Sequence, residues 1–149
     1  MVQKDYLLRQ IEVLAQLLIA IREMIFGGEA GGGDVEARLQ EVAGRGGMDL
    51  ELARAATPDT LRMLIAPTGE IEPGRCWLLA ETLYLDGVHR QLLGHSAPAS
   101  DSLAKAGMLF SLLQPMGAFL VGFPEAAERV REIEERMEEL GGLETETLE

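Results

Sequence analysis

Few side chains in this sequence have the types and spacing that metal binding requires. Asp86 and His89 are three residues apart, so on a helix a carboxylate and an imidazole share one face. That spacing occurs in metal-binding four-helix bundles, but a di-metal site needs a second such pair and two more carboxylates. The other histidine, His95, has no acid at ligand spacing. The pattern therefore favours a histidine that pairs with its own helix, and we predict no metal site.

Two further groups of reactive side chains have simple interpretations. The single cysteine, Cys76, follows Arg75 in an apolar run without a nearby histidine, which favours an inert core residue over a nucleophile. Acid pairs one helical turn apart alternate with arginines near the C-terminus, which is typical of a solvated face. These residues are Glu128, Glu132, Glu135 and Glu139, with Arg129, Arg131 and Arg136. We predict no catalytic residues.

The glycine-rich segments 27–33 and 44–47 raise the question of a phosphate-binding loop. A P-loop requires lysine and a hydroxyl residue after its last glycine, whereas Gly33 is followed by Asp34, whose charge repels phosphate. Neither segment follows an expected strand, as a dinucleotide site requires. The glycines therefore favour linkers, and we expect no cofactor.

The composition is that of a single acidic domain. With 149 residues, 47% of them apolar, the chain can bury a core. A net charge of -12 repels phosphate backbones and anionic lipids, which argues against nucleic-acid and membrane partners. The apolar run 13–21 is too short to cross a bilayer and lacks the flanks of a signal peptide. Because a single cysteine cannot form an internal disulfide, we expect a cytoplasmic protein.

The strongest helical pattern covers residues 3–26, which contain neither glycine nor proline. Apolar residues alternate at spacings of four and three, and so form a seam that faces a partner helix. The seam consists of Leu7, Ile11, Leu14, Leu18, Ile21 and Ile25. A second stripe consists of Tyr6, Val13, Leu17, Ala20 and Met24. A face this broad must be covered on two sides, by the chain's own helices or by a second copy.

Start and stop signals locate the other helices. After the linker 27–33, a short polar helix is expected at 34–42, and Thr57-Pro58-Asp59 is a typical helix start. A helix from Pro73 to Gly94 should form an antiparallel hairpin with a helix at 101–114, across a loop at 95–100.

The predicted fold class is all-α, either a helical bundle or antiparallel helix hairpins. A charged C-terminal helix is expected at 125–140, before a frayed tail at 141–149. No alternating strand pattern of useful length occurs, since the best candidate, 118–121, is short and lies between glycines. We expect one domain over 1–149, in which the N-terminal helix joins a helical core at 34–140.

The predicted hairpin also carries a family resemblance. Its residues Leu79, Ala80, Leu83, Gly87, Ala106 and Phe110 resemble the packing positions of a tetratricopeptide helix pair. Together with the opening Gln-Lys-Asp-Tyr-Leu-Leu-Arg-Gln-Ile-Glu, regions 3–12 and 48–115 are similar to an uncharacterised bacterial family of tetratricopeptide-like helical proteins. The resemblance implies a helical fold, with no known activity and no functional residues to carry over. The glycines at 27–33 depart from the charged, alanine-rich helix expected there.

Two functions from different classes are considered, and a structural or regulatory subunit of a larger complex is a third possibility. The first is a non-enzymatic interaction module that self-associates as a homodimer through the N-terminal helix and can offer a groove to another protein's helix. The second is a small-molecule binder or unrecognised enzyme with an apolar pocket between helices. The residues of this candidate pocket are Trp77, Tyr84, Phe110, Met116 and Phe119. The same residues fit an ordinary core, since apolar residues at helical spacing are usually buried.

Overall fold

The computed structural model describes residues 2–28, 32–117, 120 and 122–148, with the side chains of residues 9–28, 33–117, 120 and 122–142. It confirms the all-α prediction, because the described residues form a packed helical bundle without a strand. The helices are α1 (Val2–Gly27), α2 (Gly32–Arg45), α3 (Leu50–Ala55), α4 (Pro58–Ile65), α5 (Pro73–Leu92), α6 (Ser96–Leu113), the short 3-10 helix η1 (Gln114–Met116) and α7 (Ala126–Leu148).

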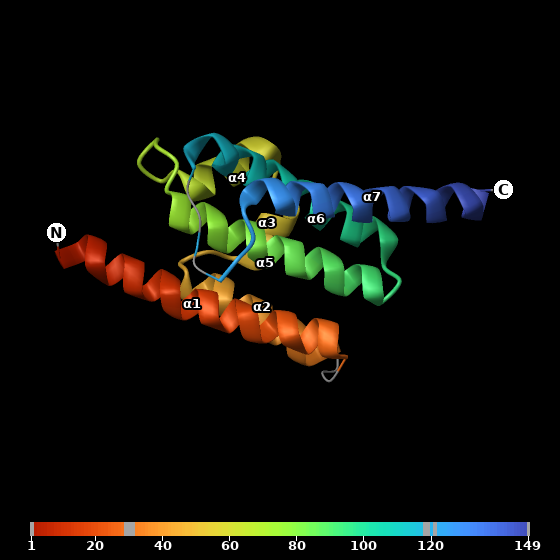
Figure 1. The fold of residues 1–149 in the computed structure, drawn as a ribbon, viewed down its shortest axis with the longest axis horizontal. Coiled ribbons are helices and arrows are strands. Elements are labelled where there is room, and N and C mark those ends of the chain that lie inside the picture. The colour runs from red at the N-terminus through yellow and green to blue at the C-terminus, as the bar shows by residue number, and fades with distance from the viewer. Residues whose placement is uncertain (1, 29–31, 118–119, 121, 149) are drawn as a thin grey trace.

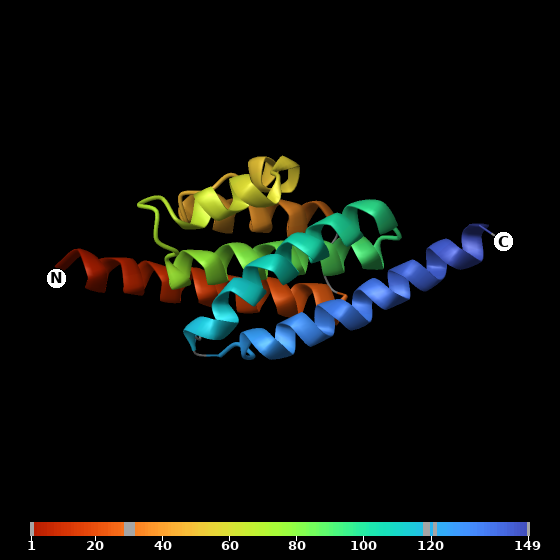
Figure 2. The ribbon, with the colours of Figure 1, turned by 90° about the horizontal axis from the view of Figure 1, so that it is seen from above.

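Helix α5 lies at the centre of the bundle. It forms an antiparallel hairpin with α6, while α1 and α2 lie side by side against another of its faces (Figure 1). Helices α3 and α4 cover the side opposite α7, which packs along α6 (Figure 2). The N-terminal end of α1 and the C-terminal end of α7 project beyond the body in opposite directions (Figures 1 and 2).

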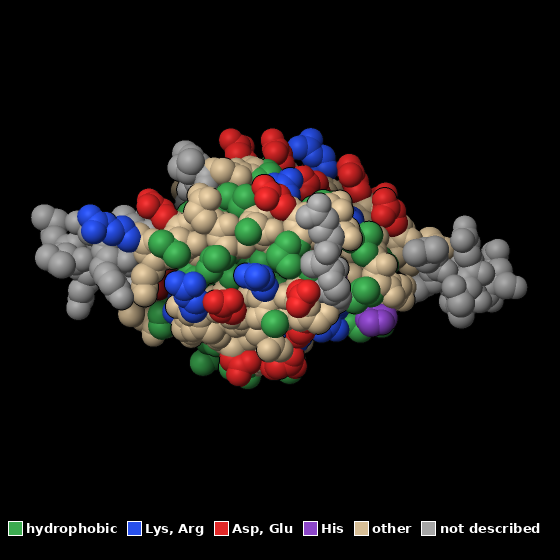
Figure 3. Space-filling view, turned by 90° about the horizontal axis from the view of Figure 1, so that it is seen from below, with side chains coloured by type: hydrophobic (Ala, Val, Ile, Leu, Met, Phe, Trp, Pro, Cys, Tyr) green, Lys and Arg blue, Asp and Glu red, His purple; other side chains and the backbone are tan. Residues whose placement is uncertain are grey.

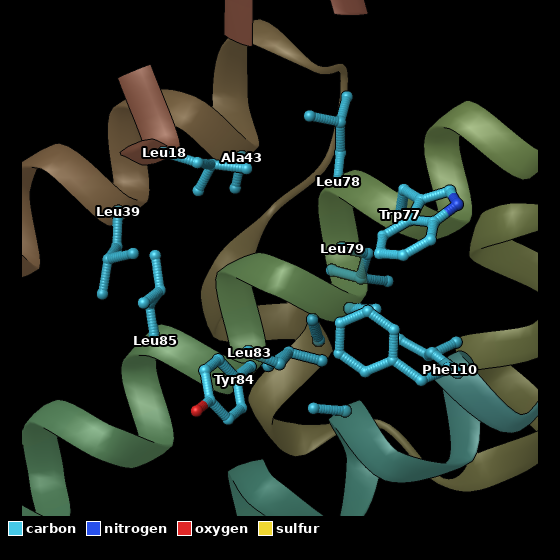
Figure 4. Packing of buried hydrophobic residues seen from close by; sticks show 14 of the residues in the cluster. Leu18, Leu39, Ala43, Trp77, Leu78, Leu79, Leu83, Tyr84, Leu85 and Phe110 are labelled. Carbon is cyan, nitrogen blue, oxygen red and sulfur yellow. The ribbon is translucent and has the colours of Figure 1, made fainter. Parts of the chain in front are cut away.

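The central position of α5 explains its burial. Every residue from Cys76 to His89 is buried, although this stretch contains the polar residues Glu81, Thr82 and Asp86. Apolar side chains surround it, among them Leu39 of α2 and Phe110 of α6 (Figure 4). A helix buried on all sides must find partners within the protein for each of its polar groups.

Some helix boundaries differ from the sequence prediction. The cap at Thr57 is confirmed, since its side chain accepts a hydrogen bond from the Thr60 backbone N–H. Helix α6 starts at Ser96 rather than 101. Pro98 has no backbone N–H to donate, but the first turn of a helix does not require one. The sequence prediction missed α3, which Asp49 caps by accepting from the Glu51 and Leu52 N–H groups. Helix α7 continues to Leu148, whereas fraying was expected from 141.

The α5–α6 hairpin packs closely at Gly87. A Cβ atom added there would lie 2.6 Å from Leu103 Cγ and 3.2 Å from the Leu103 backbone nitrogen. Glycine at this position therefore lets the two helices approach, and it keeps the backbone of α6 within reach of α5.

Replacement of Gly87 by alanine should lower the free energy of unfolding by about 1–3 kcal/mol, because the two helices must move apart. Urea denaturation measures this change. The matched control is Gly107→Ala in α6, where the added Cβ would lie 3.5 Å from Ile133 Cγ2, an ordinary contact. The control should be neutral or stabilising by up to about 1 kcal/mol through helix propensity. Equal effects of the two substitutions would contradict the close approach.

Candidate functional site

The predicted seam of α1 faces the chain's own core. Leu14, Leu18, Ile21 and Ile25 are buried, and Leu18 lies beside Ala43 of α2 (Figure 4). Ile11 is partly buried at the start of α5, where any side chain on Gly74 would meet its Cδ1 atom. The side chain of Leu7 lies outside the described residues. From Leu14 to Ile25 the seam is thus already covered within one chain, so a second copy cannot reach this part without opening the bundle.

Three of the candidate pocket residues lie in the core of the bundle. Trp77, Tyr84 and Phe110 are core residues, at most 2% exposed. The rings of Trp77 and Phe110 pack edge to face with centroids 5.3 Å apart. Met116 at the end of η1 is 43% exposed, and Phe119 lies outside the described residues. The three aromatic side chains therefore contribute to packing, as their helical spacing allows.

The second stripe of α1 remains accessible and forms the floor of a groove between α1 and α2. Val13 is 50% exposed, Ala20 is exposed, and Leu17 and Met24 are partly buried. The groove contains two hollows. The hollow nearer the N-terminus, about 300 Å³, is lined by Arg9, Gln10, Val13, Leu14 and Arg45. The other, about 340 Å³, is lined by Leu17, Ala20, Ile21, Glu23, Met24, Arg38, Glu41 and Val42. We call this feature the α1–α2 groove.

Charged side chains border the α1–α2 groove. Arg9 and Arg45 line the hollow nearer the N-terminus together, and no acid is among the lining residues that the structure describes. The carboxylate of Glu41 is 4.0 Å from the Arg45 guanidinium, with both side chains about half exposed. Such a pair contributes little. The face that carries α1 and α2 shows apolar side chains interspersed with arginines and acids (Figure 3).

Glu23 stands on the outer edge of α1. It lines the hollow with Leu17 and Met24 on one side, and on the other side a hollow with Ile19, Arg22 and Phe26. A residue shared by two hollows on either side of a helix projects away from the body. The Glu23 carboxylate is therefore presented to whatever approaches α1.

The C-terminal end of α1 is held to α7 through Phe26. Its ring is 51% exposed, yet the guanidinium carbons of Arg22 and Arg136 lie 6.0 Å and 5.8 Å from its centroid. Arg136 also donates to Gln91 Oε1 at 2.9 Å. Two cations near one aromatic ring anchor this end of α1 weakly.

A buried ion pair joins α7 to α5. Arg129 donates two hydrogen bonds to Glu81, at 2.9 Å and 2.7 Å, and both residues are only 1% exposed. The Arg129 guanidinium also packs on the Tyr84 ring, with its carbon 4.6 Å from the centroid. The prediction of a wholly solvated face on the last helix is therefore wrong at Arg129, whose partner lies on a helix 48 residues away.

The pKa values of Glu81 and Glu132 are shifted in opposite directions. Burial raises the pKa of Glu81, and the charge of Arg129 opposes this shift. For Glu132, burial favours the neutral form, but the hydrogen bond from Tyr84 and the charge of Arg129 outweigh it, so its pKa lies below the usual value. Glu132 is therefore an acid of α7 whose charged form is stabilised by Tyr84 and Arg129.

Asp86 and Arg54 together link four helices. Its carboxylate accepts from Arg54 of α3 at 2.6 Å, from Ser102 of α6 at 2.7 Å and from Arg90 of α5 at 3.2 Å. Arg54 also binds Glu36 of α2, with both contacts at 2.7 Å. Burial alone would raise the pKa of Asp86, but the bonds from Arg54 and Ser102 hold it below its usual value. Because these donors occupy both carboxylate oxygens, Asp86 has no free oxygen with which to bind a metal together with His89.

Cys76 is a buried core residue. Its thiol donates to the Leu109 carbonyl oxygen at 3.4 Å, and burial raises its pKa to about 12. At neutral pH it stays protonated, which removes the thiolate that a nucleophile needs.

Over the part of the chain that the structure describes, no group of three or more metal-ligating side chains forms a site. Nor does any helix among these residues have the length and apolarity needed to span a bilayer. The α1–α2 groove combines exposed apolar side chains with charged side chains along its border, and we take it as the candidate functional site. No protein-family model, curated protein or solved structure matches this chain.

Proposed function

We propose that this protein is a helical interaction module that self-associates through the α1–α2 groove. The observation that carries the proposal is the exposed stripe of Val13, Leu17, Ala20 and Met24 along the floor of the groove. Apolar side chains of this kind, bordered by charged ones, are typical of a surface that another helix covers.

The proposed occupant is α1 of a second copy. Stripe residues at spacings of four, three and four follow one helical face, so the stripe suits a helix rather than an extended peptide. The same helix supplies both the floor of the groove and a matching ridge, as an isologous dimer requires. The seam buried inside the chain leaves this stripe as the side of α1 that a second copy can reach.

The module fits a reducing compartment such as the cytoplasm, since its one cysteine is buried as a protonated thiol. The alternative of a small-molecule pocket receives no support from the aromatic residues, because Trp77, Tyr84 and Phe110 fill the core.

Sedimentation equilibrium of the full chain tests the proposal. The wild-type protein should be a dimer, and Val13→Glu should raise the dimer dissociation constant at least about tenfold, because a carboxylate would be buried at an apolar contact. The control is Met63→Glu on α4, where an apolar side chain 72% exposed lies away from the groove. This control should leave the dissociation constant unchanged. A wild-type protein that stays monomeric at high concentration would overturn the proposal, as would equal effects of the two variants.

A further inference from the structure

We propose that the two copies pack their α1 helices antiparallel, so that Glu23 of each copy enters the hollow between Arg9 and Arg45 of the other. This inference rests on the proposed self-association through the α1–α2 groove and names the contact that orients it.

The order of residues along the stripe supports an antiparallel arrangement. Leu17 is near the centre of the stripe, so a two-fold axis close to it brings Leu17 of the two copies together. Val13 of one copy then faces the turn that contains Ala20 of the other. Ala20 is small and exposed, and therefore permits close approach of the two helices.

Charge complementarity selects the same arrangement. The antiparallel pairing places Arg9 of one copy opposite the turn of Glu23 and Met24 of the other, and the two-fold axis repeats the contact. Arg45, which lines the same hollow as Arg9, adds a second cation to receive the carboxylate. A parallel pairing would instead place Arg9 against Arg9 and Glu23 against Glu23, and like charges across an interface oppose binding.

A charge-swap experiment tests the contact in the full chain. The first variant carries Arg9→Glu and Arg45→Glu, and the second carries Glu23→Arg. Each variant alone places like charges at both contacts of its homodimer, so its dissociation constant should rise at least about tenfold. In an equimolar mixture both contacts become attractive again, and native mass spectrometry should show a one-to-one heterodimer with an affinity near that of the wild type.

Controls separate a specific contact from a general charge effect. The variant with Arg62→Glu and Arg131→Glu has the same net charge as the first variant, but its exposed sites lie on α4 and α7. It should dimerise like the wild type, and circular dichroism should show the same helicity for every variant.

The possible results divide between the two proposals. If Val13→Glu dissociates the dimer but the charge variants dimerise normally, or the mixture does not recover, the antiparallel contact is wrong and the groove remains the interface. If the wild type is monomeric, both proposals fail. Recovery that occurs only in the mixture supports the contact.

Discussion

Replacing Arg129 with alanine is expected to lower the free energy of unfolding by about 3–5 kcal/mol, the largest effect of any single substitution considered for this protein. Arg129 is only 1% exposed and its guanidinium lies 2.7 Å from Glu81 Oε1, so its loss leaves a buried carboxylate without a cation. The loss should be smaller in mild acid than at neutral pH. Burial raises the pKa of Glu81 and Arg129 opposes this shift, so in the variant the raised pKa is unopposed. In mild acid the Glu81 carboxyl of the variant therefore takes up a proton and avoids the cost of an unpaired buried charge, and this relief is lost as the pH rises through the raised pKa.

The control for Arg129→Ala lies two residues along the same helix. Arg131 is exposed, so Arg131→Ala should change the free energy of unfolding by less than about 0.5 kcal/mol. A double variant with Glu81→Leu and Arg129→Met, which removes both charges and keeps the volume, should regain most of the stability. Urea denaturation measures all three. If Arg129→Ala costs no more than Arg131→Ala, the buried pair does not hold α7 to α5.

Replacing Leu18 with alanine is expected to cost about 2–5 kcal/mol, because it opens a cavity between α1 and α2 where the side chain is 0% exposed. The destabilisation should be the same at low and high protein concentration, since Leu18 packs within one chain. Thermal unfolding at two concentrations, followed by circular dichroism, measures it.

Val13→Ala provides the comparison on the opposite side of α1. Its side chain is 50% exposed in the single chain, so the truncation should change the stability of the monomer by less than about 0.5 kcal/mol. A cost for Leu18→Ala that shrinks as the concentration rises would show instead that the seam serves a second chain.

The periodicity of α1 identified both of its apolar stripes, but not which one faces outward. Leu18 and Val13 are both aliphatic, and each lies on an apolar stripe with helical spacing. Spacing alone therefore cannot distinguish the stripe that faces the core from the stripe that is exposed. That distinction depends on α2, which packs against one side of α1. The groove, which needs walls from both helices, was therefore beyond prediction from one helix.

Arg129 could not be predicted as a buried residue from its own helix. Its neighbours Glu128 and Arg131 are exposed, as the charged pattern indicates, and nothing in α7 distinguishes Arg129 from them. The available signal lay in α5, where Glu81 interrupts the apolar run after Cys76. A carboxylate at the centre of a buried helix requires a cation from another element. The sequence shows that need without showing which of the arginines meets it.

Short elements escaped prediction for a different reason. Helix α3 has only six residues, fewer than two turns, so it presents too few apolar positions to show a period. Its cap at Asp49 was the usable signal. The loop predicted at 95–100 belongs largely to α6, because Pro98 is compatible with a first helical turn, where the backbone N–H groups have no helical partner.

The two acids buried in α5 have a consequence for the uniqueness of the fold. A helix that is apolar on every side loses little burial when it rotates about its axis, so hydrophobic packing alone fixes its orientation weakly. Glu81 accepts from Arg129 of α7, and Asp86 accepts from Arg54 of α3. Because these cations lie on different helices, a rotation by one residue position, about 100°, would break both pairs at once. The two carboxylates thus fix the rotation of α5 about its axis. They disfavour misfolded states in which α5 is rotated, which the apolar residues alone would allow.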